Sequence, residues 1–296
     1  MFRSIVDDIQ TQFRTGNMIT RLIILNIGIW AVMALLKSFS PADSSFYPTL
    51  VEYLAIPGDP MTLLLRPWTI ITHMFIHADF WHVFWNMIIL YWFGRIVGDL
   101  VGDKHILPVY FAGGMAGALA YLVSHQLMPG VVGPYALGAS AAVMALVMAA
   151  GRIAPDYLMH LILIGAVKLK FIVLALVFFD LLGAGGSSNT GGHIAHLAGV
   201  AMGWYFVSQM GSRGDLSSRF GAFAQWLGGI FAPATSKPAK KGNLTVKYKS
   251  DRLQKTTDSS DSLEQQVDGI LEKIKVSGFE SLTKEEREIL ARASQK

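Results

Sequence analysis

The sequence predicts an all-α polytopic membrane protein with six spanning helices and a small helical cytoplasmic tail. Three observations predict this fold class: the composition, six apolar runs, and an uneven distribution of Lys and Arg between the connections. Of the 296 residues, 52% are hydrophobic and 16% are charged, whereas a soluble domain carries about 25% charged residues. The mean hydropathy is +0.41. This composition excludes a disordered chain and argues against a single water-soluble globule.

The six apolar runs are the expected spanning helices. They cover residues 19–36, 81–97, 106–127, 138–150, 169–182 and 194–207. The stretch 157–167 is also apolar, but Lys168 and Lys170 follow it at once. We therefore expect that stretch to lie at the membrane surface and to lead into the fifth helix.

Lys and Arg residues predict the orientation, because they accumulate in connections on the cytoplasmic side. Ten of them lie in the segments of one side, and only Lys37 and Arg66 lie in those of the other side. This distribution places both termini in the cytoplasm. The connections 128–137 and 184–192 then face outward, and neither carries a charge. The first run begins after eighteen residues without a cleavage pattern, so we expect it to remain as an anchor.

Composition divides the chain into five segments. Residues 1–18 form a cytoplasmic N-terminal segment, and residues 19–210 form the membrane domain, which is neutral overall. Residues 211–231 predict an interfacial helix, and residues 232–262 a linker with a basic stretch that anionic lipid attracts. Residues 263–296 predict a helical hairpin whose second helix starts at a Thr-x-x-Glu capping pattern. The sequence identifies no partner for this hairpin.

Four polar residues lie within the expected membrane helices, where such side chains are costly and are functional candidates. His82 and Asn86 belong to the second helix, Ser140 to the fourth and His196 to the sixth. All three helices enter from the outer side, and each residue lies within the first turns of its helix. The four side chains are therefore expected at one shallow depth below the outer surface.

The residues around Ser140 and His196 predict that their two helices touch. Ser140 is flanked by small residues, and two glycines, Gly199 and Gly203, follow His196 at one-turn intervals. Small residues at such spacing allow membrane helices to approach closely. Contact would bring the imidazole within hydrogen-bond reach of the hydroxyl, and a serine nucleophile needs such a base. His82 and Asn86 share one helix face, and Asn amides are suitable donors for an oxyanion.

These residues also carry three sequence motifs. The first extends from Arg66-Pro67-Trp68 through Thr72-His73-Met74-Phe75-Ile76-His77-Ala78 to His82-x-x-x-Asn86. The second is Gly138-Ala139-Ser140-Ala141, and the third is Ala195-His196-Leu197-Ala198-Gly199. With the order and number of helices, they make residues 19–208 resemble the rhomboid family of intramembrane serine proteases, specifically its bacterial six-helix type. The family motif is Gly-x-Ser-Gly, so Ala141 is a departure from it.

The resemblance implies that Ser140 attacks the scissile carbonyl and that His196 acts as general base and then as general acid. His82 and Asn86 would line the oxyanion hole with the Ser140 backbone N–H, and no third acidic residue, cofactor or metal would be needed. The substrate would be a single-span membrane protein, cut near the outer face of the bacterial inner membrane. Membrane lipid is the other expected partner, and nucleic acid is not expected. The loop 184–192 and the fifth helix would gate substrate entry, and the outer loop 38–66 would lie partly in the membrane.

Several alternatives remain open at this point. Taken singly, each polar residue could serve only in helix packing. Asp180 is expected to anchor the loop that follows it, with a role as carboxylate partner of His196 as the alternative. The histidine spacings allow metal or haem ligation, as in a transporter or haem-binding bundle, but no His-x-x-Glu or His-Glu-x-x-His pattern supports it. Ala141 leaves a catalytically weak or inactive adaptor, which binds transmembrane clients without cutting them, as the alternative function.

Overall fold

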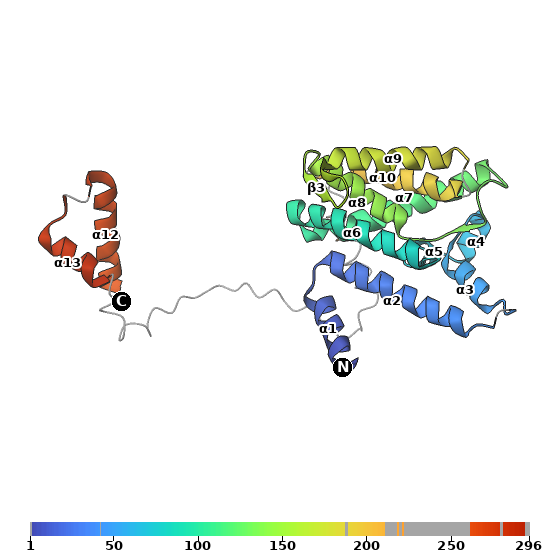
Figure 1. Ribbon diagram of the computed structural model, residues 1–296, viewed down its shortest axis with the longest axis horizontal. Coiled ribbons are helices and arrows are strands. Elements are labelled where there is room, and N and C mark those ends of the chain that lie inside the picture. The colour runs from blue at the N-terminus through green and yellow to red at the C-terminus, as the bar shows by residue number, and fades with distance from the viewer. Residues whose placement is uncertain are drawn as a thin grey trace. The chain divides into compact units, whose positions relative to one another are not determined.

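The computed structural model describes residues 2–41, 43–186, 189–210, 218, 221, 261–278 and 281–293. The chain divides into two compact units, Met1–Ala232 and Pro233–Lys296 (Figure 1). Apart from single helical positions at 218 and 221, the predicted interfacial helix 211–231 lies outside the described residues. All but the last two residues of the predicted linker 232–262 lie outside them as well.

Helices occupy the six predicted apolar runs. They are α2 (Met18–Phe39), α6 (Phe80–Val101), α7 (Ile106–Leu127), α8 (Ser140–Ile153), α9 (Leu169–Ala184) and α10 (Thr190–Gln209). In the described part of the chain, α2, α6 and the stretch Asp103–Leu127 are long and apolar enough to cross a membrane, and α8 is a shorter apolar helix. The all-α membrane class is therefore confirmed, whereas the number of six spans stays a prediction for α8, α9 and α10.

Helix α8 forms the centre of the membrane domain and contacts α6, α7, α9 and α10. Ala142, Ala145 and Ala149 are completely buried along it. Close approach is possible because glycines face α8 from both sides. A methyl group on Gly199 of α10 would overlap the carbonyl oxygen of Ala141, and one on Gly203 would overlap that of Ala145. The backbones of α8 and α10 are thus in direct contact, as small residues permit in membrane bundles.

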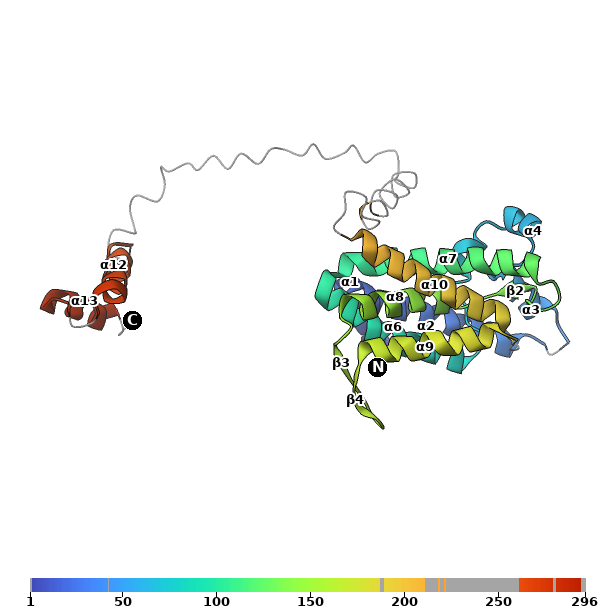
Figure 2. The same cartoon turned by 90° about the horizontal axis from the view of Figure 1, so that it is seen from above.

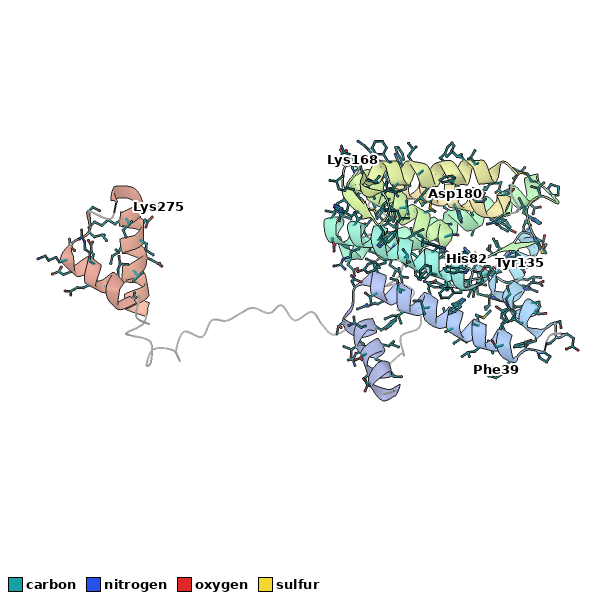
Figure 3. All side chains as sticks on the ribbon, viewed as in Figure 1. Phe39, His82, Tyr135, Lys168, Asp180 and Lys275 are labelled. Atoms are coloured by element: carbon teal, nitrogen blue, oxygen red, sulfur yellow. The ribbon has the colours of Figure 1, made fainter. Side chains whose placement is uncertain are left out.

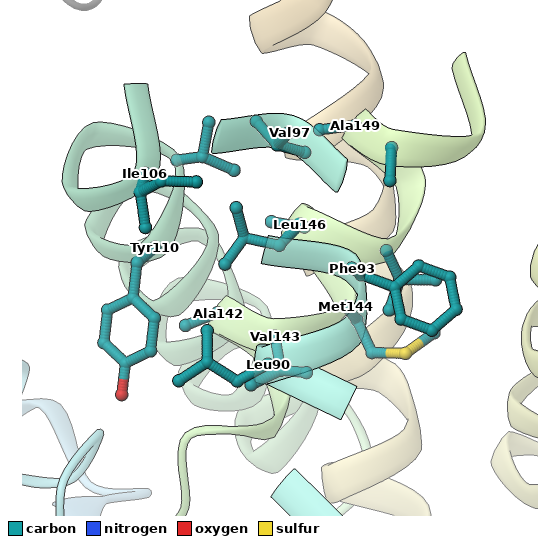
Figure 4. Packing of buried hydrophobic residues seen from close by; sticks show 14 of the residues in the cluster. Leu90, Phe93, Val97, Ile106, Tyr110, Ala142, Val143, Met144, Leu146 and Ala149 are labelled. Carbon is teal, nitrogen blue, oxygen red and sulfur yellow. The ribbon is translucent and has the colours of Figure 1, made fainter. Parts of the chain in front are cut away.

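Larger side chains fill the space between α6 and α8. Figure 4 shows Leu90 and Phe93 of α6 beside Val143 and Leu146 of α8 in one buried cluster. Leu90 and Leu146 have no exposed surface. Inside a bilayer such packing stabilises through van der Waals contact, because lipid tails are as apolar as the side chains. This packing sets the position of the start of α8 relative to α6.

The described part of the long connection between α2 and α6 contains several short elements. It contains α3 (Phe46–Leu54), β1 (Ile56–Pro57), α4 (Pro60–Leu65) and α5 (Thr69–Thr72). Strand β1 pairs antiparallel with β2 (Tyr135–Ala136), just before α8. Farther along the same segment, the Gly138 N–H donates to the carbonyl oxygen of His73 at 2.8 Å. These backbone bonds hold the segment before Ser140 against the outer loop.

The stretch 157–167, predicted as a surface connection without assigned structure, forms an antiparallel β-hairpin. Its strands are β3 (Leu158–Leu161) and β4 (Gly165–Lys168), and Figure 2 shows them projecting from the helices. Lys168 and Lys170 contact the carboxylate of Asp156 at 3.1 and 2.8 Å. The hydrogen bond from Lys170, and to a lesser extent that from Lys168, holds the pKa of the Asp156 carboxyl below its usual value. The tip is apolar, and Ile162 is 99% exposed.

Two further segments complete the described chain. Residues 1–18, which the sequence analysis left without an element, contain α1 (Phe2–Thr15). The C-terminal unit contains α12 (Asp261–Ser277) and α13 (Lys284–Ala293). Lys273 of α12 forms an ion pair with Glu286 of α13 at 2.8 Å. Glu286 and Thr283 also exchange hydrogen bonds at the start of α13, which is the geometry of a capping box.

The contact between α8 and α10 predicts a large difference between two Gly→Ala variants. We expect Gly199→Ala to lower the free energy of unfolding by about 1–3 kcal/mol, because the methyl overlaps the backbone of Ala141. Gly28→Ala in α2 is the matched control, since that position is open and alanine favours a helix by about 1 kcal/mol. Thermal unfolding in detergent measures both variants. Equal melting temperatures would contradict the close contact.

Candidate active site

Ser140 is the first residue of α8, and the turn before it depends on a glycine. Gly138 has φ +121°, a backbone conformation that side chains disfavour. A methyl group there would also lie 2.6 Å from His82 Nε2. Glycine at 138 therefore serves both the turn and the close approach of an imidazole. As the first helical residue, Ser140 has a backbone N–H without an intrahelical acceptor.

The structure brings Ser140 and His196 together. His196 lies in the second turn of α10, and its Nε2 is 2.6 Å from Ser140 Oγ. The backbone contact at Gly199, one turn further along α10, keeps the two helices close enough for this distance. A hydroxyl hydrogen-bonded to an imidazole nitrogen is the arrangement in which histidine removes the serine proton.

Asp180 of α9 is the third member of this chain of contacts. Its Oδ1 lies 2.8 Å from His196 Nδ1 and 2.8 Å from His193 Nδ1, and the residue is buried. Of the two roles that the sequence left open for Asp180, this contact favours that of carboxylate partner of His196; that the reaction needs no third acidic residue stays a prediction. An ionised carboxylate only accepts hydrogen bonds, so His196 carries its proton on Nδ1. Its Nε2 then presents a lone pair to the Ser140 hydroxyl.

His82 and Asn86 lie on the neighbouring helix α6, next to the nucleophile turn. The Asp79 carboxylate caps α6 by accepting from the His82 backbone N–H at 2.9 Å. His82 Nδ1 accepts from the Ala78 N–H at 3.4 Å, which leaves the proton on Nε2, the atom beside Gly138. Asn86 is buried, and its Nδ2 donates to the His82 carbonyl oxygen at 2.8 Å.

Two histidines of the outer loop support the same turn. His77 is 4% exposed, and its Nε2 accepts from the Ala139 N–H at 3.4 Å. Its ring also meets the His82 ring edge-on, with centroids 5.0 Å apart. Because the Gly138 N–H donates to His73, the two amides just before Ser140 are occupied. In the sequence His77 is only one member of the first motif, and no local pattern indicates its contact with the turn before Ser140.

A cavity of about 1030 Å³ opens above these groups. Ser140, His196, His82 and Asn86 all line it, together with apolar side chains of α6 and α9 such as Trp85 and Phe179. Figure 3 shows His82 and Asp180 toward the Tyr135 end of the membrane domain, with Lys168 at the opposite end. The arrangement therefore offers a candidate nucleophile, a candidate base and candidate oxyanion donors to one open, largely apolar cavity.

Ala141, the departure from the family motif, points away from this cavity. A methyl group on Gly117 of α7 would overlap the Cβ of Ala141, so the alanine methyl already packs against that glycine. Ala141 is 7% exposed. Its side chain therefore occupies a helix–helix contact and does not line the large cavity, although it borders a small one of about 30 Å³ that Ser140 also lines.

Comparisons with known proteins agree with these motifs. Residues 65–213, half of the chain, match the rhomboid domain, and residues 247–296 match a family of unknown function, DUF6576. RHOMBOID-like protein 12, mitochondrial, of Arabidopsis thaliana is 33% identical over 147 residues, which are 45% of this chain and 44% of that protein. Rhomboid protein 1, mitochondrial, of Saccharomyces cerevisiae is 29% identical over 135 residues, 45% of this chain and 36% of that protein.

The chain thus spans less than half the length of these curated relatives. The matched segment contains Ser140, His196, His82, Asn86 and Asp180 and reaches from the outer loop to the end of α10. On the extent of this match, the chain belongs to the rhomboid family.

Proposed function

We propose that the protein is an intramembrane serine endopeptidase that cleaves single-span membrane proteins near the outer membrane face. The observation that carries the proposal is the continuous contact from Asp180 through His196 to Ser140 beneath the cavity. Rhomboid proteins are in general intramembrane serine proteases, which supports the same activity.

In the proposed reaction, Ser140 and His196 act once in forming the acyl-enzyme and once in its hydrolysis. Ser140 Oγ attacks the scissile carbonyl while His196 Nε2 takes its proton, and Asp180 stabilises the imidazolium that forms. The oxyanion accepts from His82 Nε2–H, from the Asn86 amide and from the Ser140 backbone N–H. His196 then protonates the leaving amine, and the acyl-enzyme forms. A water molecule, deprotonated by His196, releases the new carboxylate and restores the serine.

The walls of the cavity support a membrane-embedded substrate. Side chains of α6 and α9 line it, and Trp85 and Phe179 on these helices are 54% and 65% exposed. An apolar segment that approaches between α6 and α9 reaches Ser140 without crossing the polar end of the bundle. Small residues in the substrate would help, because the segment must leave its helical conformation to expose a peptide bond.

The proposed topology has both termini in the cytoplasm, supported by the ten Lys and Arg residues that gather on that side. The expected bacterial inner membrane stays a prediction, and the printed names of the relatives above place those proteins in mitochondria. A non-catalytic adaptor on the same fold is the alternative. The residue that favours the adaptor in the sequence is Ala141, whose methyl group packs on Gly117 of α7.

Ser140→Ala is expected to lower turnover of a single-span substrate by at least about 10⁴-fold, because the nucleophile is lost while the fold keeps its packing. Cleavage by the purified chain in detergent, with a thermal unfolding control, measures this. A fluorophosphonate probe distinguishes the adaptor: labelling that requires both Ser140 and His196 excludes it. Cleavage at the wild-type rate by Ser140→Ala would refute the protease.

Asp180→Asn tests the positioning of His196. An asparagine amide turned toward Nδ1 donates a hydrogen bond to that nitrogen, which favours the tautomer with the proton on Nε2 and removes the base. We expect kcat to fall by about 10²–10⁴-fold while KM changes little, because Asp180 does not need to contact the substrate. Asp180→Glu should restore part of the rate. An unchanged kcat in Asp180→Asn would show that the carboxylate has no part in the reaction.

Ala141→Gly, which restores the family motif, tests whether the alanine methyl group serves in helix packing or affects catalysis. Turnover should be preserved or increased, because the methyl group lies against α7. Stability should fall by about 1 kcal/mol, since glycine is a poorer helix former. The measurements are kcat and the melting temperature in the same detergent. A loss of activity of about 100-fold, the size of an oxyanion-hole defect, would contradict this role of Ala141.

A further inference from the structure

One histidine of the site has no role in the proposed reaction. His193 Nδ1 lies 2.8 Å from the same Asp180 oxygen that contacts His196. The three side chains offer ligand atoms that all lie within 4.8 Å of one another. We propose that Asp180, His193 and His196 form a binding site for a divalent transition-metal ion of the Zn²⁺ class. Its inhibitory effect rests on the proposed function, because the metal would hold the histidine that serves as the base.

The ligand set suits such an ion. Zn²⁺ binds imidazole nitrogen and carboxylate oxygen at about 2.0–2.2 Å, and sites with three protein ligands keep a water in the fourth position. Two imidazoles and one carboxylate give this set, whereas Ca²⁺ and Mg²⁺ require mostly oxygen ligands. The chain has no cysteine, so no thiolate elsewhere competes for the ion. The sequence analysis found no local carboxylate pattern because Asp180 comes from a different helix.

The backbone around His193 is built to hold its ring beside Asp180. His193 and His196 lie three residues apart on one face of α10, with ring centroids 5.8 Å apart. Opposite them, Gly183 follows Asp180 by one turn of α9. A methyl group on Gly183 would overlap Nε2 of the His193 ring. The absence of a side chain at 183 therefore creates the space in which the second imidazole reaches the carboxylate.

Exposure allows an ion to reach the three groups from solvent. The side chain of His193 is 26% exposed, that of His196 19% and that of Asp180 10%. The carboxylate is thus nearly enclosed, while both rings keep an accessible edge. An ion that enters beside His193 meets all three ligand atoms with small rotations of the side chains. Each present N···O distance of 2.8 Å has to widen by only about 0.5 Å to fit tetrahedral ligand spacing.

Metal binding would reverse the hydrogen bond to the nucleophile. The ion takes the Nδ1 lone pair of each ring, so the proton that Nδ1 now donates to Asp180 moves to Nε2. The Nε2–H group of His196 would then donate a hydrogen bond to Ser140 Oγ, whereas the proposed reaction requires Nε2 to accept the serine proton. The serine would keep its proton, and cleavage would stop until a chelator removes the ion. Neither ring loses or gains a proton in this change.

The first experiment measures binding without using activity. The untagged full-length Ser140→Ala chain in detergent keeps all three ligands. It should bind one equivalent of Zn²⁺ in equilibrium dialysis and give the visible absorption of tetrahedral Co²⁺. His193→Ala in the same background should lower the affinity at least about tenfold, and His193→Gln repeats the test if the alanine variant unfolds. His160→Ala, which removes an exposed histidine of β3, should leave the affinity unchanged.

A second experiment measures inhibition. Wild-type cleavage should fall in proportion to Zn²⁺ occupancy and recover with chelator, whereas His193→Ala should need at least about ten times more Zn²⁺. Binding that does not saturate, or that has equal affinity with and without His193, would overturn the site. Full occupancy with an unchanged cleavage rate would overturn the inhibitory effect. If Ser140→Ala binds Zn²⁺ but the metal-free wild type does not cleave the substrate, the metal site is supported and only the proposed protease function is contradicted.

Discussion

The backbone contact between α8 and its two neighbours determines the geometry of the site. Gly199 and Gly203 of α10 meet the carbonyl groups of Ala141 and Ala145 on one side, and Gly117 of α7 meets Ala141 on the other. Larger side chains at these glycine positions would separate the helices and move His196 away from Ser140. In a bilayer, where apolar surface gains little by leaving lipid, such close van der Waals contact is a main source of helix association. The 2.6 Å distance between His196 Nε2 and Ser140 Oγ is therefore a consequence of how the helices pack.

Buried polarity is concentrated where these contacts have already fixed the backbone. Asp180 is buried and accepts from two imidazoles, and the amides before Ser140 are paired with His73 and His77. A polar group without a partner at this depth would cost about 1–3 kcal/mol. These hydrogen bonds hold the turn before Ser140, whereas among the described residues His77 Nδ1 is buried without a hydrogen-bond partner, and the Ser140 N–H has no acceptor within α8.

The sequence predicts the helices and the Ser140–His196 pair because glycine and alanine spacing marks which faces of two helices touch. It does not predict the contact of Asp180 with His196. Helix α9 is apolar on nearly every side, so its pattern does not indicate which face turns toward α10. The β3–β4 hairpin was missed for a related reason: a short apolar run is compatible with helix, strand or surface loop. Gly165, with φ +87°, marks its turn only once the strands are known.

Because Asp180 contacts both His193 and His196, substitutions at these three positions have unequal consequences. A substitution at Asp180 leaves the Nδ1–H groups of both His193 and His196 without their acceptor, and the two rings are only 26% and 19% exposed. A substitution at His193 leaves the Asp180–His196 contact in place. The three positions are therefore not equally free to drift: changes at 193 are tolerated alone, whereas changes at 180 demand compensation on α10.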